Sequence, residues 1–282
     1  MQKSFKEVKP TLYVVSTPIG NLKDITYRAV EILREVDFIL AEDTRTSSVL
    51  LSHYDIKKPL LSYHEFNKEE QETKIIDLLN EGKSLALISD AGTPGISDPG
   101  YEIIKRVIEE GFYAVSIPGA SAILSALVVS GLIIQPFTYI GFLPRKANDQ
   151  KNVLEDYKTR KETLVIYESP MRIEKTLKIL FEVLGDRNIA IARELTKAFE
   201  TIIRTTLKEA SLMEMNPKGE YVIIIEGGLH ETEQPLLDVK SHYLELIKAG
   251  YPQKEAMKIV AGKHNLSKND VYRIVKIDEV SS

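Results

Sequence analysis

The sequence predicts an α/β protein with two α/β domains followed by a small helical module. Short apolar runs alternate with segments of helical periodicity, an order typical of a mostly parallel sheet. The pattern restarts around residues 130–135, which predicts domains over residues 11–133 and 134–230. Beyond a Gln-Pro-Leu linker, three short helical patterns predict a module over residues 236–282.

The composition is that of a globular protein and excludes several kinds of chemistry. Of the 282 residues, 43% are hydrophobic and 28% are charged, and the net charge is −4. The chain has no cysteine, which excludes disulfides, thiolate metal sites and cysteine nucleophiles, and its histidines are scattered, so no metal is expected. It shows neither a membrane-spanning apolar run nor a signal peptide, so we expect a cytoplasmic protein.

The N-terminal domain is predicted from four apolar runs that each end in a polar or glycine-rich loop. These runs predict strands at residues 11–16, 38–41, 85–88 and 115–117. Asp24 is a predicted N-cap for the first helix, whose buried stripe includes Ala29 and Leu33. Residues 42–48 predict a charged loop, and further helices are expected at residues 68–80, at residues 101–110 and up to residue 129.

The second domain and the C-terminal module follow from the same patterns. Strands are predicted at residues 137–142, 163–167 and 189–192, late antiparallel strands at 199–206 and 221–226, and helices at 148–161 and 173–184. The module reads as helices at residues 239–249, 253–264 and 268–275, of which the last resembles the second helix of a helix-turn-helix with Ser267 as its cap. Lysine and arginine outnumber acidic residues over these helices, a modest basic surface.

The strongest functional signal is Asp90-Ala-Gly-Thr-Pro-Gly-Ile-Ser-Asp-Pro-Gly100, which directly follows a predicted buried strand. In open α/β sheets, ligands bind beyond the carboxyl ends of the strands, where this loop must lie. Its glycines allow the backbone to approach a ligand closely, and its carboxylates supply acceptors. No Gly-x-Gly-x-x-Gly follows the first strand, so a dinucleotide site is not supported.

Several sequence blocks together resemble one family. They are Thr17-Pro-Ile-Gly-Asn-Leu-Lys-Asp-Ile-Thr26, Ala41-Glu-Asp-Thr-Arg45, residues 87–100, Ile117-Pro-Gly-Ala-Ser121, Gly141-Phe-Leu-Pro-Arg-Lys146, Tyr167-Glu-Ser-Pro-Met-Arg172 and Arg193-Glu-Leu-Thr-Lys197. In this order they resemble the bacterial 16S ribosomal RNA cytidine 2′-O-methyltransferases of the tetrapyrrole methylase superfamily. The first loop departs from that family's pattern by lacking a glycine before Ile19, and Phe66 stands where a second histidine is usual.

The resemblance implies a fold, a cofactor, a substrate and an assembly. It implies the tetrapyrrole methylase fold, in which two α/β domains hold S-adenosylmethionine in the cleft between them. It also implies a homodimer whose substrate is a cytidine ribose in the decoding region of 16S rRNA in the small ribosomal subunit. The expected reaction is therefore S-adenosylmethionine-dependent 2′-O-methylation.

The resemblance also directs attention to residues that suit such a cofactor. The cofactor needs acceptors for its ribose and amino-acid ends, an apolar slot for adenine, and close backbone approach. The expected cofactor-binding residues are Pro18, Ile19, Asp90, Gly92, Thr93, Ile96, Ser121, Ala122, Tyr167 and Ala192.

A protonated 2′-hydroxyl is a poor nucleophile, so a nearby base or cation is expected. Lys197 or Glu168 is expected nearest the ribose oxygen, with Glu42 as a further catalytic candidate. Basic side chains are expected to bind RNA phosphates, namely Arg45, Arg145, Lys146, Arg172 and Arg193.

Two other functions stay open at the level of sequence. A carbon methyltransferase of the same fold would act on a tetrapyrrole such as a precorrin or uroporphyrinogen and would need a porphyrin-sized apolar cleft. A non-catalytic ribosome-binding module would act through the helix-turn-helix-like end. Tetrapyrrole binding by absorbance, salt-sensitive retention of 30S subunits and cofactor binding by calorimetry distinguish the three.

Overall fold

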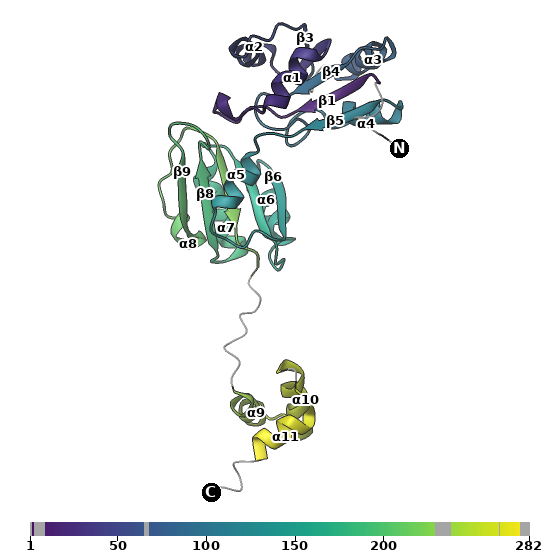
Figure 1. Ribbon diagram of the computed structural model, residues 1–282. Helices are drawn as coiled ribbons and strands as arrows, with labels where there is room; N and C mark the ends of the chain where they lie inside the picture. Colours follow the sequence, from purple (N-terminus) through teal and green to yellow (C-terminus); the bar gives the residue numbers. More distant parts are fainter. Residues whose placement is uncertain (1, 3–8, 65–67, 229–237, 265, 277–282) are drawn as a thin grey trace. The chain divides into compact units, whose positions relative to one another are not determined.

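A computed structural model describes residues 2, 9–64, 68–228, 238–264 and 266–276 of the chain. The chain divides into a first unit, residues 1–228, and a second unit, residues 229–282. The described part of the first unit holds two five-stranded sheets, and that of the second holds helices only (Figure 1). Phe66 lies outside the described residues, and the boundary predicted near residue 133 stays a prediction.

The first sheet is parallel throughout, with strand order β3-β2-β4-β1-β5, which confirms the predicted parallel arrangement. Its elements are β1 (Thr11–Val15), α1 (Tyr27–Glu35), β2 (Phe38–Ala41), α2 (Thr44–His53), β3 (Leu60–Ser62), α3 (Lys68–Asn80), β4 (Leu85–Ile88), α4 (Tyr101–Glu109) and β5 (Tyr113–Ile117). Alternate side chains of β4 enter different cores: Leu85 and Leu87 pack with α3 and α4, whereas Ala86 and Ile88 pack with α1 and α2. Burial on both faces explains why this strand reads as a continuous apolar run.

The second sheet is mixed, with strand order β6-β7-β10-β8-β9. Strands β6 and β7 are parallel, β10 is antiparallel to both β7 and β8, and β9 is antiparallel to β8. The late antiparallel strands are thereby confirmed. The elements are α5 (Ala122–Val129), β6 (Phe137–Phe142), α6 (Ala147–Glu155), β7 (Thr163–Glu168), α7 (Ile173–Leu184), β8 (Asn188–Arg193), β9 (Thr201–Thr206), α8 (Leu207–Ala210) and β10 (Tyr221–Ile225).

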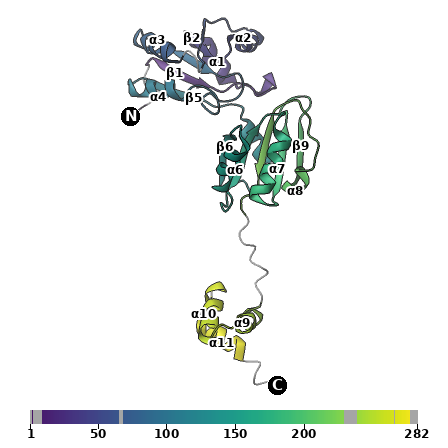
Figure 2. The same cartoon turned by 180° about the vertical axis from the view of Figure 1, so that it is seen from behind.

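Helix α5 precedes the second sheet in the sequence and packs on one of its faces. Ile123 and Leu127 of α5 share a core with Val222 of β10, whereas α6 and α7 pack in a separate core with the other side chains of the same strands. Figure 2 shows α6 and α7 lying over one face of this sheet. Ile19, from the loop after β1, joins the core beneath α5. The first loop of the chain is therefore anchored to the second sheet, which brings loops of the first sheet to the second.

The predicted N-cap of α1 is wrong. Thr26 is the N-cap, because its side-chain oxygen accepts the N–H of Ala29 at 3.1 Å. Asp24 instead ends a separate 3-10 turn, η1 (Leu22–Asp24), whose N-cap is Asn21.

The charged loop predicted over residues 42–48 is also wrong. Helix α2 begins at Thr44, and the Asp43 side chain accepts the N–H of Arg45 at 2.8 Å as its N-cap. The acidic residue that suggested a loop is in fact a helix-start signal. The helix predicted over residues 148–161 is shorter, because α6 ends at Glu155 and is followed by turns.

The second unit consists, where described, of α9 (Val239–Lys248), α10 (Gln253–Lys263) and α11 (Lys268–Lys276), as predicted. The helices pack around Tyr243, Val260 and Val271. Ser267 caps α11 as expected: its hydroxyl accepts the N–H of Asp270 at 3.2 Å and donates to the Asp270 carboxylate at 2.6 Å. Among the described residues of the whole chain, we find no helix with the length and apolarity needed to cross a bilayer.

Candidate active site

The loops that follow β1 and β4 are joined side by side. Thr17 and Gly92 exchange two backbone hydrogen bonds, of 2.8 and 3.2 Å. The Ser16 and Thr93 hydroxyls lie 2.8 Å apart. Because β1 and β4 are neighbouring parallel strands, both loops lie at the carboxyl edge of the sheet, as the sequence predicts.

The loop over residues 90–100 depends on backbone conformations that favour glycine. Gly92, Gly95 and Gly100 have φ values of +82°, +81° and +146°. At Gly100 a Cβ atom would also lie 3.1 Å from a methyl of Leu87. Ser97 adopts φ +64° without being glycine, and its hydroxyl is held 2.6 Å from the Tyr139 hydroxyl. Such conformations persist where the surroundings impose them, often at ligand sites.

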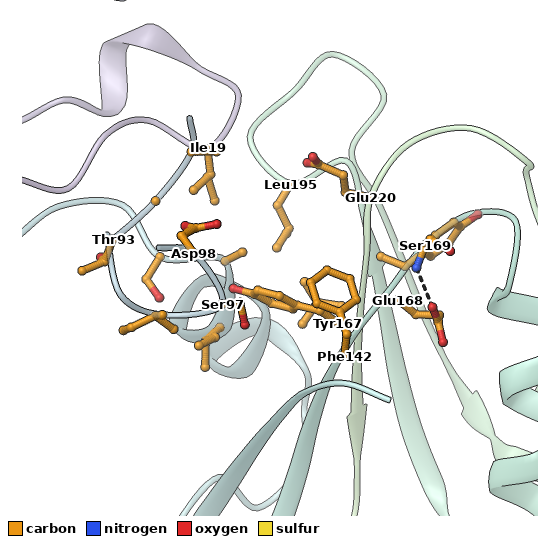
Figure 3. Close-up of a pocket in the computed structure, with 18 of the residues that line it drawn as sticks. Ile19, Thr93, Ser97, Asp98, Phe142, Tyr167, Glu168, Ser169, Leu195 and Glu220 are labelled. Carbon is orange, nitrogen blue, oxygen red and sulfur yellow. Dashed lines mark hydrogen bonds between the residues drawn. The ribbon is translucent and has the colours of Figure 1, made fainter. Parts of the chain in front are cut away.

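This loop forms one wall of a cavity of about 320 Å³, called here the first cavity (Figure 3). The opposite wall comes from the second sheet and its loops. The volume is at the lower end of the range for small-ligand sites. The lining residues are Ile19, Ala91, Gly92, Thr93, Ile96, Ser97, Asp98, Ser121, Ala122, Ile123, Phe142, Tyr167, Glu168, Ser169, Pro170, Leu195, Glu220, Tyr221 and Val222.

Aromatic rings form part of the apolar wall of the first cavity. Tyr167 stands edge-on to Tyr139 and Phe142, with centroid distances of 5.1 and 5.6 Å. Burial raises the pKa of the Tyr167 hydroxyl, which a backbone hydrogen bond from Ile123 partly offsets. The hydroxyl is therefore neutral at physiological pH and is held at the beginning of α5.

Asp98 is one of three acidic residues that line the first cavity, together with Glu168 and Glu220. Burial raises the pKa of its carboxyl to about 6, and the negative charge of Asp90 adds to the rise, while a hydrogen bond from Ser89 opposes it. A carboxylate that is partly desolvated in an apolar cavity favours a positively charged ligand group.

The raised pKa predicts a pH-dependent effect of Asp98→Asn. The folded protein holds this proton more tightly than the unfolded chain, so ionised Asp98 destabilises the fold increasingly as the pH rises from 3.8 towards about 6. Asparagine removes this cost, and we expect the Tm to rise by about 2–4 °C at pH 7.5 and to change little at pH 4. Calorimetry at both pH values checks this. The exposed Asp77 on α3 supplies the control Asp77→Asn, and an equal shift at both pH values contradicts the prediction.

A second cavity of about 420 Å³ adjoins the first. The two share Ile19, Ala91 and Glu220 as lining residues. The second cavity is lined by Thr17, Pro18, Ile19, Gly20, Leu22, Thr46, Ser47, Val49, Leu50, Ser89, Asp90, Ala91, Lys197 and Glu220.

Lys197 presents a fixed cation to the second cavity. Its Nζ lies 2.8 Å from Glu194 Oε1 and 3.0 Å from Glu220 Oε2. Burial lowers the pKa of Lys197, but the hydrogen bonds to these two carboxylates outweigh burial and raise it overall. Lys197 is therefore an ammonium donor at neutral pH and not a base. Gly20 makes room for it, since a Cβ there would lie 2.5 Å from Lys197 Cγ.

The turn that carries Lys197 is strained. Glu194 and Thr196 have φ values of +53° and +68°, although neither is glycine. The turn is held by Glu200, whose carboxylate accepts the N–H of Thr196 at 2.6 Å, and by a 3.1 Å backbone hydrogen bond from Glu194 to Glu220. A costly conformation held in this way marks the turn as a candidate functional element.

The structure brings most of the predicted cofactor residues together and separates others. Those that line the first cavity are Ile19, Gly92, Thr93, Ile96, Ser121, Ala122 and Tyr167. Pro18 and Asp90 instead line the second cavity, with Lys197. Ala192 lines neither cavity, because its side chain is 1% exposed and packs in the core beneath α5. That Ala192 walls the adenine slot therefore stays a prediction, which these contacts do not support.

Two of the predicted catalytic carboxylates do not suit that role. Glu168 borders the first cavity, but its carboxylate is buried and accepts a hydrogen bond from Ser169 N–H at 2.8 Å (Figure 3). It also accepts a hydrogen bond from the Thr176 hydroxyl at 2.6 Å. The guanidinium of Arg172 adds an ion pair at 3.2 Å. These contacts occupy the carboxylate, so we assign Glu168 to holding the loop. Glu42 lines neither cavity; burial and the charges of nearby aspartates raise its pKa.

The predicted RNA-binding side chains differ in whether they already bond to protein groups or are exposed to solvent. Arg172 donates to the carbonyls of Leu143 and Pro144 at 2.8 and 3.0 Å, so its guanidinium holds these loops together, and its role as a phosphate clamp stays a prediction. Arg193 donates to the Lys218 carbonyl at 2.8 Å. Arg45 pairs with Asp43 at 2.7 Å but has a side chain that is 89% exposed. Arg145 and Lys146 are exposed.

Sequence reasoning missed several cavity residues. Asp98 and Ser97 lie inside the loop that was singled out, and their position in a carboxylate-rich turn was the available signal. Phe142 and Leu195 lie inside the quoted blocks. The sequence also holds no local signal for Glu220, which directly precedes β10, or for Tyr221 and Val222, which begin it. Only the order of strands in the sheet brings these residues to the cavity.

The family is decided by the match of the chain to the tetrapyrrole (corrin/porphyrin) methylases, which extends over residues 11–211. The chain belongs to the tetrapyrrole methylase family. This tetrapyrrole methylase is 46% identical to ribosomal RNA small subunit methyltransferase I of Halalkalibacterium halodurans, over 95% of the chain and 96% of that protein. It is 47% identical to the Bacillus subtilis protein of the same name, over 93% of the chain and 92% of that protein. The chain is therefore a methyltransferase, and the predicted resemblance is confirmed.

Solved structures confirm the tetrapyrrole methylase fold. Diphthine synthase superposes with a TM-score of 0.62 at 17% identity, covering 79% of this chain and 92% of its own. A cobalt precorrin-4 methyltransferase superposes with a TM-score of 0.54 at 20% identity, covering 77% of this chain and 94% of its own. The predicted α/β class of this tetrapyrrole methylase is thereby confirmed.

Proposed function

We propose that this methylase transfers the methyl group of S-adenosylmethionine to the 2′-oxygen of a cytidine in the decoding region of 16S rRNA. The observation that carries the proposal is the identity of 46–47% over more than nine-tenths of the chain to proteins named as small-subunit rRNA methyltransferases. The protein acts on the small ribosomal subunit in the cytoplasm, as a homodimer. Light scattering of the purified chain tests the homodimer.

The first cavity fits S-adenosylmethionine in size and chemistry. Gly92 leaves the backbone open to close approach, and Tyr167 and Leu195 offer apolar surface for adenine. Asp98 supplies a carboxylate that favours a positive charge. The beginning of α5, at Ser121 and Ala122, favours the carboxylate end of the ligand because it is the positive end of the helix dipole. When bound, S-adenosylmethionine supplies a methyl group on a positively charged sulfur.

Lys197 is the residue that we assign to the acceptor oxygen. Its ammonium lies beside Glu220, which lines both cavities and so stands where they meet. A cation held there by two carboxylates stabilises the negative charge that develops on a ribose oxygen as its proton passes to water and the oxygen takes up the methyl group. Exposed Arg45, Arg145 and Lys146, together with Arg193, bind the phosphates that flank the target.

The proposed reaction is tested with 30S subunits from cells that lack the gene. Subunits, S-adenosylmethionine with a labelled methyl group and the purified protein are combined, and the rRNA is digested and examined by mass spectrometry. We expect label in 2′-O-methylcytidine at one position. Label on a base or on another nucleotide contradicts the proposal. Methylation of an added tetrapyrrole, with no label in rRNA, supports the alternative carbon methyltransferase.

A further inference from the structure

The second cavity is placed to bring an acceptor next to the methyl donor. It shares Ile19, Ala91 and Glu220 with the first cavity. Lys197 lines the second cavity but not the first. In-line displacement requires donor and acceptor to meet across such a shared border. We propose that the second cavity receives the ribose and base of the target nucleotide and that Ser47 of α2 is a hydrogen-bonding partner of that nucleotide. The inference rests on the proposed function.

Ser47 is one of the residues that line this cavity, and its buried hydroxyl is a polar group that the fold itself does not explain. The residue is 2% exposed, and its Oγ finds no hydrogen-bond partner among the residues that the structure describes. A buried hydroxyl without a partner costs free energy, so native proteins seldom keep one without a reason. Leu51, one turn further along α2, packs in the apolar core of the first sheet, and the described residues of that core offer no hydrogen-bond partner for the Ser47 hydroxyl. Because Ser47 also lines the second cavity, a bound polar ligand is the partner that its hydroxyl lacks.

The other lining residues have the mixed character that a nucleoside requires. Leu22, Val49 and Leu50 supply apolar surface for the face of a base. Asp90 supplies an acceptor for hydroxyl or amino groups, and Lys197 supplies a donor. The volume of about 420 Å³ lies within the range for small-ligand sites. Val49 is 68% exposed, so this side of the cavity is open to a large RNA.

The first test removes the Ser47 hydroxyl. Ser47→Ala is expected to lower kcat/KM for methylation of unmodified 30S subunits about 5- to 10-fold, the effect of one lost hydrogen bond to a substrate. The Tm should not fall, because the hydroxyl has no protein partner, and the Kd for S-adenosylhomocysteine should be parental. Ser48→Ala is the matched control, since Ser48 is the next residue on α2, is exposed, and its hydroxyl donates to the Thr44 carbonyl in its own helix.

The second test narrows the cavity from its exposed rim. Val49→Trp is expected to lower kcat/KM for 30S subunits about 10- to 30-fold while leaving S-adenosylhomocysteine binding parental. Because the Val49 side chain is exposed, the larger ring fits without displacing core residues, and we expect the Tm to stay parental. Ile108→Trp supplies the control, because Ile108 is an exposed apolar residue of α4 that lines neither cavity.

The outcomes separate this inference from the proposed function. Parental kcat/KM in both Ser47→Ala and Val49→Trp, with the parental protein active on 30S subunits, overturns the second cavity as the nucleotide site. A lower Tm for Ser47→Ala without a change in kcat/KM also overturns it, because Ser47 would then be structural. If instead the parental protein methylates no 30S rRNA while it binds S-adenosylhomocysteine, the proposed substrate fails.

Discussion

Lys197→Ala is expected to lower kcat for rRNA methylation about 100- to 1,000-fold at saturating S-adenosylmethionine, the usual effect of removing a group that stabilises transition-state charge. The ammonium is fixed by Glu194 and Glu220 at 2.8 and 3.0 Å, so it is oriented before substrate arrives. Single-turnover methylation of 30S subunits measures the chemical step directly. Cofactor affinity should be unchanged, because Lys197 does not line the first cavity.

The control for this variant is an exposed lysine for which the described residues show no ion pair. Lys175 is exposed on α7, and Lys175→Ala should retain the parental rate. Retention measurements over a range of salt concentrations separate lost RNA affinity from lost chemistry. A parental rate for Lys197→Ala, with unchanged affinity for 30S subunits, would exclude Lys197 from the reaction.

Ala122→Phe is expected to weaken S-adenosylhomocysteine binding at least about 100-fold, because the ring fills space that the ligand needs. Ala122 begins α5 and lines the cavity of about 320 Å³, which leaves little room for both ring and ligand. Calorimetric titration gives the Kd, and the Tm without ligand reports whether the fold is intact.

The same helix offers a matched control. Leu124 lies two positions further along α5 and is exposed, so Leu124→Phe should bind S-adenosylhomocysteine with parental affinity. Parental binding by Ala122→Phe would show that the first cavity is not the cofactor site. Equal losses in both variants would point to a general disturbance of α5.

Local pattern was sufficient to predict most of the fold. The apolar run of β4 and the periodicity of α7 each depend on neighbours in sequence, and both elements begin and end where predicted. Errors arose where one residue type serves two purposes. Asp43 suggested a charged loop, but its carboxylate caps α2. Only the buried residues Leu50 and Leu51, further along the chain, indicate a helix at this position and not a loop.

The site was less predictable because its residues meet through tertiary structure. The loop over residues 90–100 was found from its glycines and carboxylates alone. The separation of Asp90 from Gly92 into different cavities depends on the pairing of Thr17 with Gly92, which no pattern in either segment specifies. Arg172 was expected to bind RNA, yet its guanidinium donates to the backbone carbonyls of Leu143 and Pro144.

The central position of β10 has a consequence for synthesis of the chain. This strand is the last of the ten strands described, yet it lies between β7 and β8. Until residues 221–225 have left the ribosome, β7 and β8 each lack the strand that pairs with one of their two edges in the finished sheet, although β6 and β9 can pair with the other edges. Tyr221 and Val222 also line the first cavity. A nascent chain shortened before residue 221 can complete its parallel sheet, but it should not retain the methyl donor, so cofactor capture begins only late in translation.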